Sequence, residues 1–297
     1  MDKRNENKMK NSIYKKEKLS KYSWFNLGGP AETLFKPESI EDLKKFLKNN
    51  TDNKQIHVLG AGSNTLFRDS GFHGIIIKLG KNFSYTKLLK NNQIEVGAAT
   101  LDKKVSDFAK ENSLSGLEFL SCIPGSIGGA ITMNSGCYGY DISKSFVSLN
   151  AISFKGEIIS YNKDQIKFFY RGNNLKNNLI FLSAILQCEF SKKEIIEKKQ
   201  IALKSQKEQS QPSKIKTCGS TFKNPPNKKA WKLIESSSCS DLIIGGASMS
   251  PKHSNFFLNN GKATSEDIEN LITKVKEKVF LKTGINLELE IKIIGEK

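Results

Sequence analysis

Apolar residues recur at helical spacing near the C-terminal end of this chain. Thr264 and Asp267 predict a capping box, and the residues after them place one apolar stripe on a helix: Ile268, Leu271, Ile272, Val275 and Val279. Gly284 stands where a C-cap glycine belongs, because glycine readily adopts the left-handed backbone that ends many helices. The pattern therefore predicts a helix that begins after Thr264 and ends at Gly284.

A strict alternation of apolar and polar residues follows that helix. Positions 285, 287, 289, 291 and 293 are apolar, and polar residues stand between them. Since successive side chains of a strand point to opposite faces, the alternation predicts a strand with Glu288 and Glu290 on the same face. The pattern alone does not choose between these two glutamates as a functional group.

Earlier patterns predict a mixture of helices and strands. Ser39 with Asp42 predicts a capping box for a helix over residues 38–49, and a second helix is predicted over residues 101–112. Strands are predicted at residues 55–59, 74–79, 94–96, 146–154, 157–161 and 179–190. The lysine-rich residues 191–216 predict a helix followed by a loop, so we place a domain boundary there.

Two segments rich in small residues lie before residue 140. The first is Gly60-Ala61-Gly62-Ser63-Asn64, directly after a predicted strand, and the second is Pro124-Gly125-Ser126-Ile127-Gly128-Gly129-Ala130. Small residues let the backbone approach a phosphate or a flat ring closely. The first segment is not a Rossmann fingerprint, because Thr65 stands where that pattern needs glycine. Either segment alone is typical of a packed turn, whereas the two together favour one extended dinucleotide cofactor.

A third segment, residues 217–225, contains Ser220 directly after a glycine and Asn224 close by. A serine in such a loop is often only a turn residue. Neither a G-x-S-x-G elbow nor a His/Asp partner pattern accompanies it, so a serine hydrolase is not indicated. Ser220 could instead be presented to a pocket, with Asn224 as a polar anchor.

Charge and arginine content change this interpretation little. The 297 residues carry a formal net charge of +17, but the basic residues are spread out and form no patch interleaved with aromatic residues. We therefore expect solvated lysines and no nucleic-acid partner. The only arginines are Arg4, Arg68 and Arg171. A guanidinium grips a carboxylate or phosphate with two parallel bonds, so Arg68 and Arg171 each suit a ligand contact or a structural ion pair.

The composition also indicates in which compartment the protein acts and whether it binds a metal. The five cysteines form no C-x-x-C pair and the three histidines are scattered, so neither a disulfide framework nor a metal site is expected. No apolar run reaches the roughly 20 residues of a membrane span. Residues 1–22 are charged and lack a signal-peptide core, and we expect a disordered basic tail there. A cytoplasmic protein without membrane insertion is the resulting prediction.

Taken in order, nine short motifs resemble the UDP-N-acetylenolpyruvoylglucosamine reductase (MurB) family, in its shorter subtype. The motifs are NLGGPAE (26–32), VLGAGSN (58–64), RD (68–69), IPGSIGGA (123–130), MNSG (133–136), YR (170–171), GSTFKNP (219–225), KHSNF (252–256) and LELE (287–290). Each is weak alone, but the ordered set is specific. The resemblance covers residues 20–297.

The resemblance implies an α+β fold, in which an FAD-binding unit of the vanillyl-alcohol-oxidase (PCMH) type with two lobes precedes an α+β substrate-binding domain. On this basis the FAD-binding domain spans residues 23–192, with lobes at about 23–95 and 96–192. Residues 193–216 form a linker or helix, and residues 217–297 form the C-terminal substrate-binding domain. The resemblance also implies peptidoglycan precursor synthesis with FAD as cofactor and NADPH as reductant, and we expect a monomer.

Site residues carry over from the resemblance by motif. Arg171, Ser220 and Glu290 match the catalytic positions. The residues that match the FAD-binding positions are Gly60, Ala61, Gly62, Ser63, Asn64, Pro124, Gly125, Ser126, Ile127, Gly128, Gly129, Ala130, Asn134 and Gly136. Substrate contacts are expected from Lys223, Asn224 and His253. The implied chemistry is hydride delivery to an enolpyruvyl group, with Arg171 and Glu290 stabilising the enolate and Ser220 donating a proton.

Two other classes of function stay open at this point. Another FAD-dependent oxidoreductase, acting on a small hydroxy acid or lactone, would share the two glycine-rich segments but not the motif around Ser220 or the Glu290 strand. A basic nucleic-acid-binding protein would be colourless and would bind in a strongly salt-dependent manner.

Overall fold

The computed structural model describes residues 12–50 and 54–297. They divide into two units. Unit 1 takes residues 12–14, Thr33–Ala61 and Gly74–Lys207, and unit 2 takes Lys15–Glu32, Gly62–His73 and Glu208–Lys297. Each unit therefore contains segments that are far apart along the chain.

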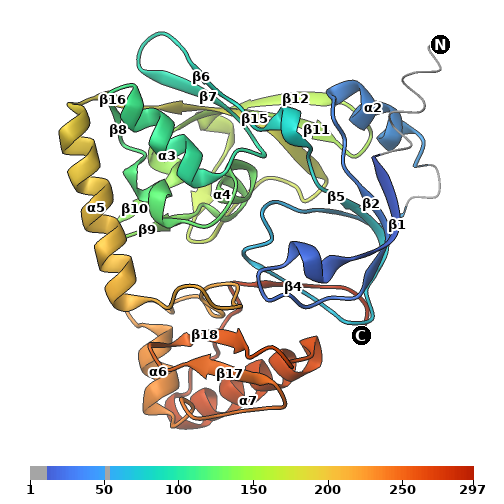
Figure 1. Ribbon diagram of the computed structural model, residues 1–297, viewed down its shortest axis with the longest axis vertical. Helices are drawn as coiled ribbons and strands as arrows, with labels where there is room; N and C mark the ends of the chain where they lie inside the picture. The colour runs from blue at the N-terminus through green and yellow to red at the C-terminus, as the bar shows by residue number, and fades with distance from the viewer. Residues whose placement is uncertain (1–11, 51–53) are drawn as a thin grey trace. The chain divides into compact units, whose positions relative to one another are not determined.

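Helices and strands alternate irregularly along the chain, as Figure 1 shows. The α-helices are α2 (Ile40–Lys48), α3 (Asp102–Glu111), α4 (Ile127–Met133), α5 (Lys193–Ser210), α6 (Ala230–Ser236) and α7 (Ser265–Thr283). The strands are β1 (Ile13–Lys18), β2 (Pro30–Phe35), β3 (Ile56–Val58), β4 (Thr65–Phe67), β5 (Phe72–Ile77), β6 (Thr86–Leu88), β7 (Gln93–Gly97), β8 (Leu114–Ser115), β9 (Gly136–Cys137), β10 (Tyr140–Asp141), β11 (Phe146–Ser153), β12 (Ile158–Asn162), β13 (Phe168–Phe169), β14 (Gly172–Asn173), β15 (Leu179–Gln187), β16 (Glu189–Phe190), β17 (Ala247–Ser250), β18 (His253–Asn259) and β19 (Lys292–Ile294). Short 3-10 helices cover Leu19–Tyr22, Lys81–Phe83, Glu118–Cys122, Ile142–Lys144 and Lys163–Gln165.

One core of unit 1 forms around α2 and the sheet with strand order β1-β2-β5-β3. The predicted helix at residues 38–49 is confirmed as α2, and the Oγ of Ser39 accepts a hydrogen bond from the N–H of Asp42 at 3.0 Å. Leu43 and Leu47 bury their side chains in this core. β3 pairs in parallel with β5, so the loop after Val58 and the loop after Ile77 leave the sheet at the same end.

A second core of unit 1 lies against the five-stranded sheet β12-β11-β15-β7-β6. Its paired neighbours are antiparallel, and α3 and α4 supply buried residues such as Val105, Ile127 and Ile131. The predicted strands at residues 94–96, 146–154 and 157–161 are confirmed as β7, β11 and β12. Residues 179–190 form two strands, β15 and β16, where the pattern predicted one.

Unit 2 has its own core, formed by α6, α7 and the antiparallel pair β17-β18 (Figure 1). The predicted C-terminal helix is confirmed as α7, with a complete capping box between Thr264 and Asp267 and Gly284 in the left-handed region at φ 69°. Its apolar stripe is buried, as the spacing predicted.

The strand predicted over residues 285–293 is wrong in extent but right in its faces. Lys292–Ile294 forms β19, which pairs in parallel with β4, and Phe222 and Leu289 meet in an isolated bridge. Leu287 and Ile291 are nonetheless buried, while Glu288 is exposed and Glu290 is half-buried on the other face. Extended backbone suffices for this alternation, whereas a continuous strand needs a partner along its whole length.

The expected disordered tail over residues 1–22 is wrong for its last part. Residues 1–11 lie outside the described residues, but Ile13–Lys18 forms β1 and Leu19–Tyr22 forms a 3-10 helix whose Leu19 is fully buried. The sequence placed residues 23–32 and 62–73 with the FAD-binding lobes, whereas in space they belong to unit 2. Among the described residues, no helix is both long and apolar enough to cross a bilayer.

Candidate functional site

The start of the first glycine-rich segment, Gly60 and Ala61, lies beside the second segment in unit 1. Gly60 follows β3, and a Cβ added to it would lie 2.9 Å from the Oγ of Ser126, the N-cap residue of α4. An extended dinucleotide needs this adjacency, because its ends are joined through one pyrophosphate. The residues that unit 1 brings together therefore fit the expected FAD.

Lys78, which no sequence pattern singles out, points its ammonium group at the first segment. Its Nζ donates to the carbonyl oxygen of Gly60 at 2.5 Å. Burial lowers the pKa of the Lys78 ammonium, and the charge of Lys36 lowers it further. A lysine directly after a buried strand carries no distinctive pattern, so only the parallel pairing of β3 with β5 reveals this contact.

The second glycine-rich segment forms a turn and then the short helix α4. Gly128 approaches the backbone of Ala98, where an added Cβ would lie 3.2 Å from the carbonyl oxygen. Gly129 is less crowded, since its added Cβ would meet only the Oγ of Ser126 at 3.8 Å. Protein packing thus accounts for Gly128, while Gly129 has room for a ligand to approach its backbone.

Asn134 ends α4 in the left-handed region at φ 42°. Its Nδ2 donates to the carbonyl oxygen of Phe169 at 3.1 Å, and its Oδ1 accepts from the N–H of Ser143 at 3.3 Å. These bonds hold the loop after α4 against the hairpin that carries Arg171.

Arg171 occupies the turn of the hairpin between β13 and β14. Its backbone has φ 61°, a left-handed conformation that costs about 1–3 kcal/mol in a residue with a Cβ. One guanidinium nitrogen donates to the carbonyl oxygen of Gly136 at 3.4 Å, and the guanidinium carbon lies 4.9 Å from the ring centre of Tyr170. Of the residues predicted for the site, unit 1 therefore brings Arg171 together with Asn134 and Gly136.

Ser220 lies on an extended segment of unit 2 with other extended segments on both sides. It pairs with Phe256 in an antiparallel bridge. The adjacent Thr221 donates its N–H to the carbonyl oxygen of Asn255 at 2.8 Å and accepts from the N–H of Glu290 at 2.8 Å. Ser220 and Glu290 are thus held on neighbouring segments by backbone hydrogen bonds.

A buried amide also fixes the Ser220 segment. Asn255 is only 2% exposed; its Oδ1 accepts from the N–H of Phe222 at 3.0 Å, and its Nδ2 donates to the carbonyl oxygen of Phe222 at 2.8 Å. Removing this side chain would leave two buried backbone groups without a partner. The role of Asn255 was not predicted, although it lies within the KHSNF motif.

Glu288 and Glu290 differ in their surroundings, although they share a face. The side chain of Glu288 is 76% exposed and forms an ion pair with Lys223 at 3.3 Å. Glu290 is half-buried, and its carbonyl oxygen accepts from the Nδ2 of Asn64 at 3.0 Å. This last contact links the Glu290 segment to the end of the first glycine-rich segment, within unit 2.

The predicted substrate residues lie at different places in unit 2. The Oδ1 of Asn224 accepts from the N–H of Ala230, at the start of α6, at 2.9 Å. His253 lies between aromatic rings, with its ring centre 4.8 Å from that of Phe256 and 6.1 Å from that of Trp231. Burial lowers the pKa of His253, and its buried Nδ1 has no hydrogen-bond partner among the described residues.

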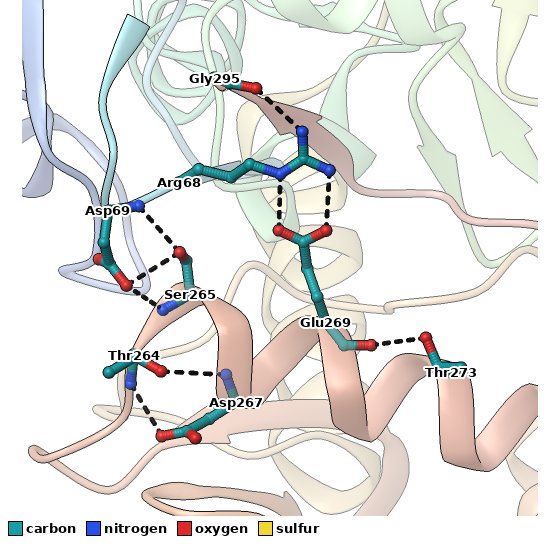
Figure 2. A network of polar contacts seen from close by, with 8 residues as sticks. All are labelled: Arg68, Asp69, Thr264, Ser265, Asp267, Glu269, Thr273 and Gly295. Atoms are coloured by element: carbon teal, nitrogen blue, oxygen red, sulfur yellow. Dashed lines mark hydrogen bonds and ion pairs between the residues drawn. The ribbon is translucent and has the colours of Figure 1, made fainter. Parts of the chain in front are cut away.

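Arg68, the other suspected arginine, forms a structural ion pair within unit 2. Figure 2 shows its guanidinium gripping both carboxylate oxygens of Glu269, at 2.7 and 2.8 Å, and the carbonyl oxygen of Gly295 at 2.9 Å. The hydrogen bond to Glu269 is the main reason why the pKa of Arg68 is raised.

No group of His, Cys, Asp and Glu in the described part of the chain has the arrangement of a metal site.

Family models match two parts of this chain. Residues 31–162 match the family model of an FAD binding domain. Residues 211–294 match the model of the UDP-N-acetylenolpyruvoylglucosamine reductase C-terminal domain. The chain is 48% identical over 279 residues to the UDP-N-acetylenolpyruvoylglucosamine reductase of Pelagibacter ubique, covering 93% of this chain and 92% of that protein. It is 44% identical over 283 residues to the reductase of Rickettsia massiliae, covering 95% and 96% of the two chains.

The chain belongs to the UDP-N-acetylenolpyruvoylglucosamine reductase family. A solved structure agrees: the MurB of Thermus caldophilus superposes with a TM-score of 0.83 at 30% identity, covering 94% of this chain and 98% of that one. The family assignment confirms the resemblance drawn from the motifs and the expected FAD-binding fold. It also confirms the prediction of an FAD-dependent oxidoreductase.

Proposed function

We propose that this chain reduces the enolpyruvyl group of UDP-N-acetylglucosamine enolpyruvate to the lactyl ether of UDP-N-acetylmuramate, with NADPH as the electron source. The observation that carries the proposal is the placement of Ser220 beside Glu290 in unit 2, through the hydrogen bond between Thr221 and the Glu290 backbone. This pair follows an FAD-binding region in a chain that matches its relatives over nearly their whole length.

The residues of unit 1 would hold the cofactor. Gly60 and Ala61, the segment from Pro124 to Ala130, and Asn134 with Gly136 would bind FAD, and Lys78 would add a positive charge beside the first segment. Gly62, Ser63 and Asn64 of the same segment belong to unit 2. FAD, when bound, supplies the hydride that passes from NADPH to the β-carbon of the enolpyruvyl group.

Arg171 would stabilise the negative charge that develops on the substrate carboxylate. A guanidinium remains cationic at all physiological pH values and can hold both carboxylate oxygens. Its strained backbone and its contacts with Gly136 and Tyr170 fix the group before substrate arrives. Preorganised charge of this kind stabilises an enolate without reorganisation during the reaction.

Ser220 would donate a proton to the α-carbon. Glu290, when protonated, would donate a hydrogen bond to the enolate. Bonds on both sides of Thr221 hold the Ser220 backbone in place, which suits a group that must act at one atom. Lys223, Asn224 and His253 would contact the nucleotide-sugar portion of the substrate. Glu288 is less suited to the chemistry, because it is solvated and already paired with Lys223.

The test is an anaerobic assay of the two half-reactions. NADPH should bleach the yellow protein, and UDP-N-acetylglucosamine enolpyruvate should then restore the flavin spectrum. An FAD enzyme of the hydroxy-acid or lactone class would instead be reoxidised by oxygen and ignore the sugar nucleotide. Colourless protein with salt-sensitive binding to DNA or RNA would exclude both enzyme classes.

We also propose that the protein acts in the cytoplasm as a monomer and binds no nucleic acid. Ser220 and Glu290 both belong to unit 2 of one chain, so no second copy is needed to bring them together. Light scattering of the purified protein at micromolar concentration should give a mass close to the 33.2 kDa of one chain. A mass near twice that value would overturn the monomer proposal.

A further inference from the structure

Asp102, in unit 1, carries a carboxyl group that takes no part in the proposed reaction. It is the first residue of α3 and is 0% exposed to solvent. Both of its carboxylate oxygens are buried, and neither has a hydrogen-bond partner among the described residues. The residue is thus in a situation that proteins usually avoid.

Such a group destabilises the chain that carries it. A buried polar group without a partner costs about 1–3 kcal/mol, and a charged one costs more. Burial raises the pKa of the Asp102 carboxyl well above its usual range, so the uncharged form is favoured. Even uncharged, the carboxyl lacks the hydrogen bonds that it would make with water.

This carboxyl lies against the turn that starts the second glycine-rich segment. A Cβ added to Gly125 would lie 2.5 Å from the Oδ2 of Asp102, and the N–H of Asp102 donates to the carbonyl oxygen of Gly125 at 3.1 Å. Leu101 and Ser126 form an antiparallel bridge directly beside these two residues. The carboxyl therefore packs where Gly125 has no side chain.

The same turn touches the first glycine-rich segment. The Oγ of Ser126 lies 2.9 Å from the position that a Cβ on Gly60 would take. The turn at Gly125 and Ser126 therefore lies where the two segments meet. Asp102 lies next to this junction and is not accessible from solvent.

We propose that Asp102 is a positioning residue for FAD: its buried carboxyl sets the shape of the turn at Gly125 and Ser126 and gains polar partners when FAD orders that turn. The proposal rests on the assignment of the glycine-rich segments to FAD. Functional sites often keep a group that is unfavourable in the free protein and favourable in the complex. Asp102 fits that description, since it costs stability and lies beside the binding segments.

The test compares flavin affinity with the stability of the flavin-free chain. Asp102→Ala removes the carboxyl, whereas Asp102→Asn keeps its shape, a donor and an acceptor. Ser237→Ala, in unit 2, is the matched control, because it removes a buried hydroxyl that has no hydrogen-bond partner among the described residues. The dissociation constant of FAD is measured from flavin fluorescence on dilution of the yellow protein, and stability from the urea midpoint after the flavin is removed.

We expect Asp102→Ala to weaken FAD binding without destabilising the flavin-free chain. Asp102→Ala should raise the FAD dissociation constant about 10-fold or more while the urea midpoint of the flavin-free chain stays the same or rises. Asp102→Asn and Ser237→Ala should stay within about 3-fold of the original dissociation constant. A lower urea midpoint in Asp102→Ala would show that Asp102 is an ordinary structural residue and would overturn the proposal. Unchanged FAD affinity in Asp102→Ala would also overturn it, as would weaker FAD binding in Asp102→Asn. If the unaltered protein binds no FAD, the proposed function itself fails, which is a separate result.

Discussion

Arg68 and Glu269 form a two-point ion pair that ties the end of β4 to helix α7 (Figure 2). The third guanidinium nitrogen of Arg68 reaches the carbonyl oxygen of Gly295, just after β19. Next to it, the Oδ2 of Asp69 accepts from both the N–H and the Oγ of Ser265, the first residue of α7. The strand β4 that follows Asn64 is therefore fixed against the segment that follows Glu290.

The first prediction concerns the stability that this ion pair gives to unit 2. Arg68→Lys should lower the free energy of unfolding by about 1–3 kcal/mol, because lysine cannot bond Glu269 at two points and Gly295 as well. The measurement is urea unfolding. Glu277→Gln, which breaks the exposed pair with Lys274 on the same helix, should cost at most about 0.5 kcal/mol. Equal losses in the two variants would contradict this interpretation.

The second prediction tests Arg171 as the group that stabilises the enolate. Arg171→Ala should lower turnover about 100- to 1000-fold while the protein remains yellow, because the charge acts on the substrate rather than on flavin retention. Steady-state rates and the visible spectrum of the purified variant provide the measurement. Unchanged turnover would remove Arg171 from the mechanism.

The third prediction separates the two half-reactions at Ser220. Ser220→Ala should slow flavin reoxidation by the enolpyruvyl substrate about 100-fold or more, since a proton donor to carbon is missing. Flavin reduction by NADPH should stay nearly intact in this variant. Stopped-flow absorbance of each half-reaction gives both rates, and an equal slowing of the two would show that Ser220 is not the proton donor.

The fourth prediction chooses between the two glutamates of the C-terminal segment. Glu290→Gln should reduce turnover about 100-fold, whereas Glu288→Gln should change it by less than about 3-fold. The reason is that Glu288 is solvated and paired with Lys223, while Glu290 is half-buried beside the Ser220 segment. Turnover of the two variants under saturating substrate checks the choice, and the reverse ranking would assign the role to Glu288.

The fifth prediction is a pH dependence of stability that arises from His57 on β3. Burial lowers the pKa of His57 to about 4, so the folded protein holds it neutral while the unfolded chain takes up a proton below about pH 6.5. Stability from this group is therefore present above pH 6.5 and is lost as the pH falls towards 4, by at most about 1.4 kcal/mol per pH unit.

The measurement compares the protein with His57→Gln, whose side chain does not titrate. The difference between their unfolding free energies should shift by about 1–2 kcal/mol between pH 7.5 and pH 5.0, in favour of the glutamine variant at the lower pH. Taking the difference removes the carboxyl titrations that both proteins share. Parallel stability curves would show that the pKa of His57 is not lowered in the folded state.

Local patterns in the sequence determined those helices and extended segments that depend on residues close to one another along the chain. The stripe of α7, its Thr264 cap and its Gly284 end were all predictable, because capping and helical spacing act within a few residues. The two faces of the Glu288 and Glu290 segment followed from alternation alone. The ordered motifs identified the family, since nine weak signals in one order are together specific.

Tertiary structure decided the properties that depend on residues far apart along the chain. The spacing of polar residues could not show that Arg68 pairs with Glu269, nor that Lys78 reaches Gly60 through the pairing of β5 with β3. It could not distinguish Glu288 from Glu290, because that difference comes from Lys223 and from the segment around Thr221. The burial of Asp102 under the turn at Gly125 is likewise invisible in the sequence, where an aspartate at a helix start looks like an ordinary solvated residue. Partners and burial arise only when distant segments pack together, and so the chemistry of these groups is determined by the fold.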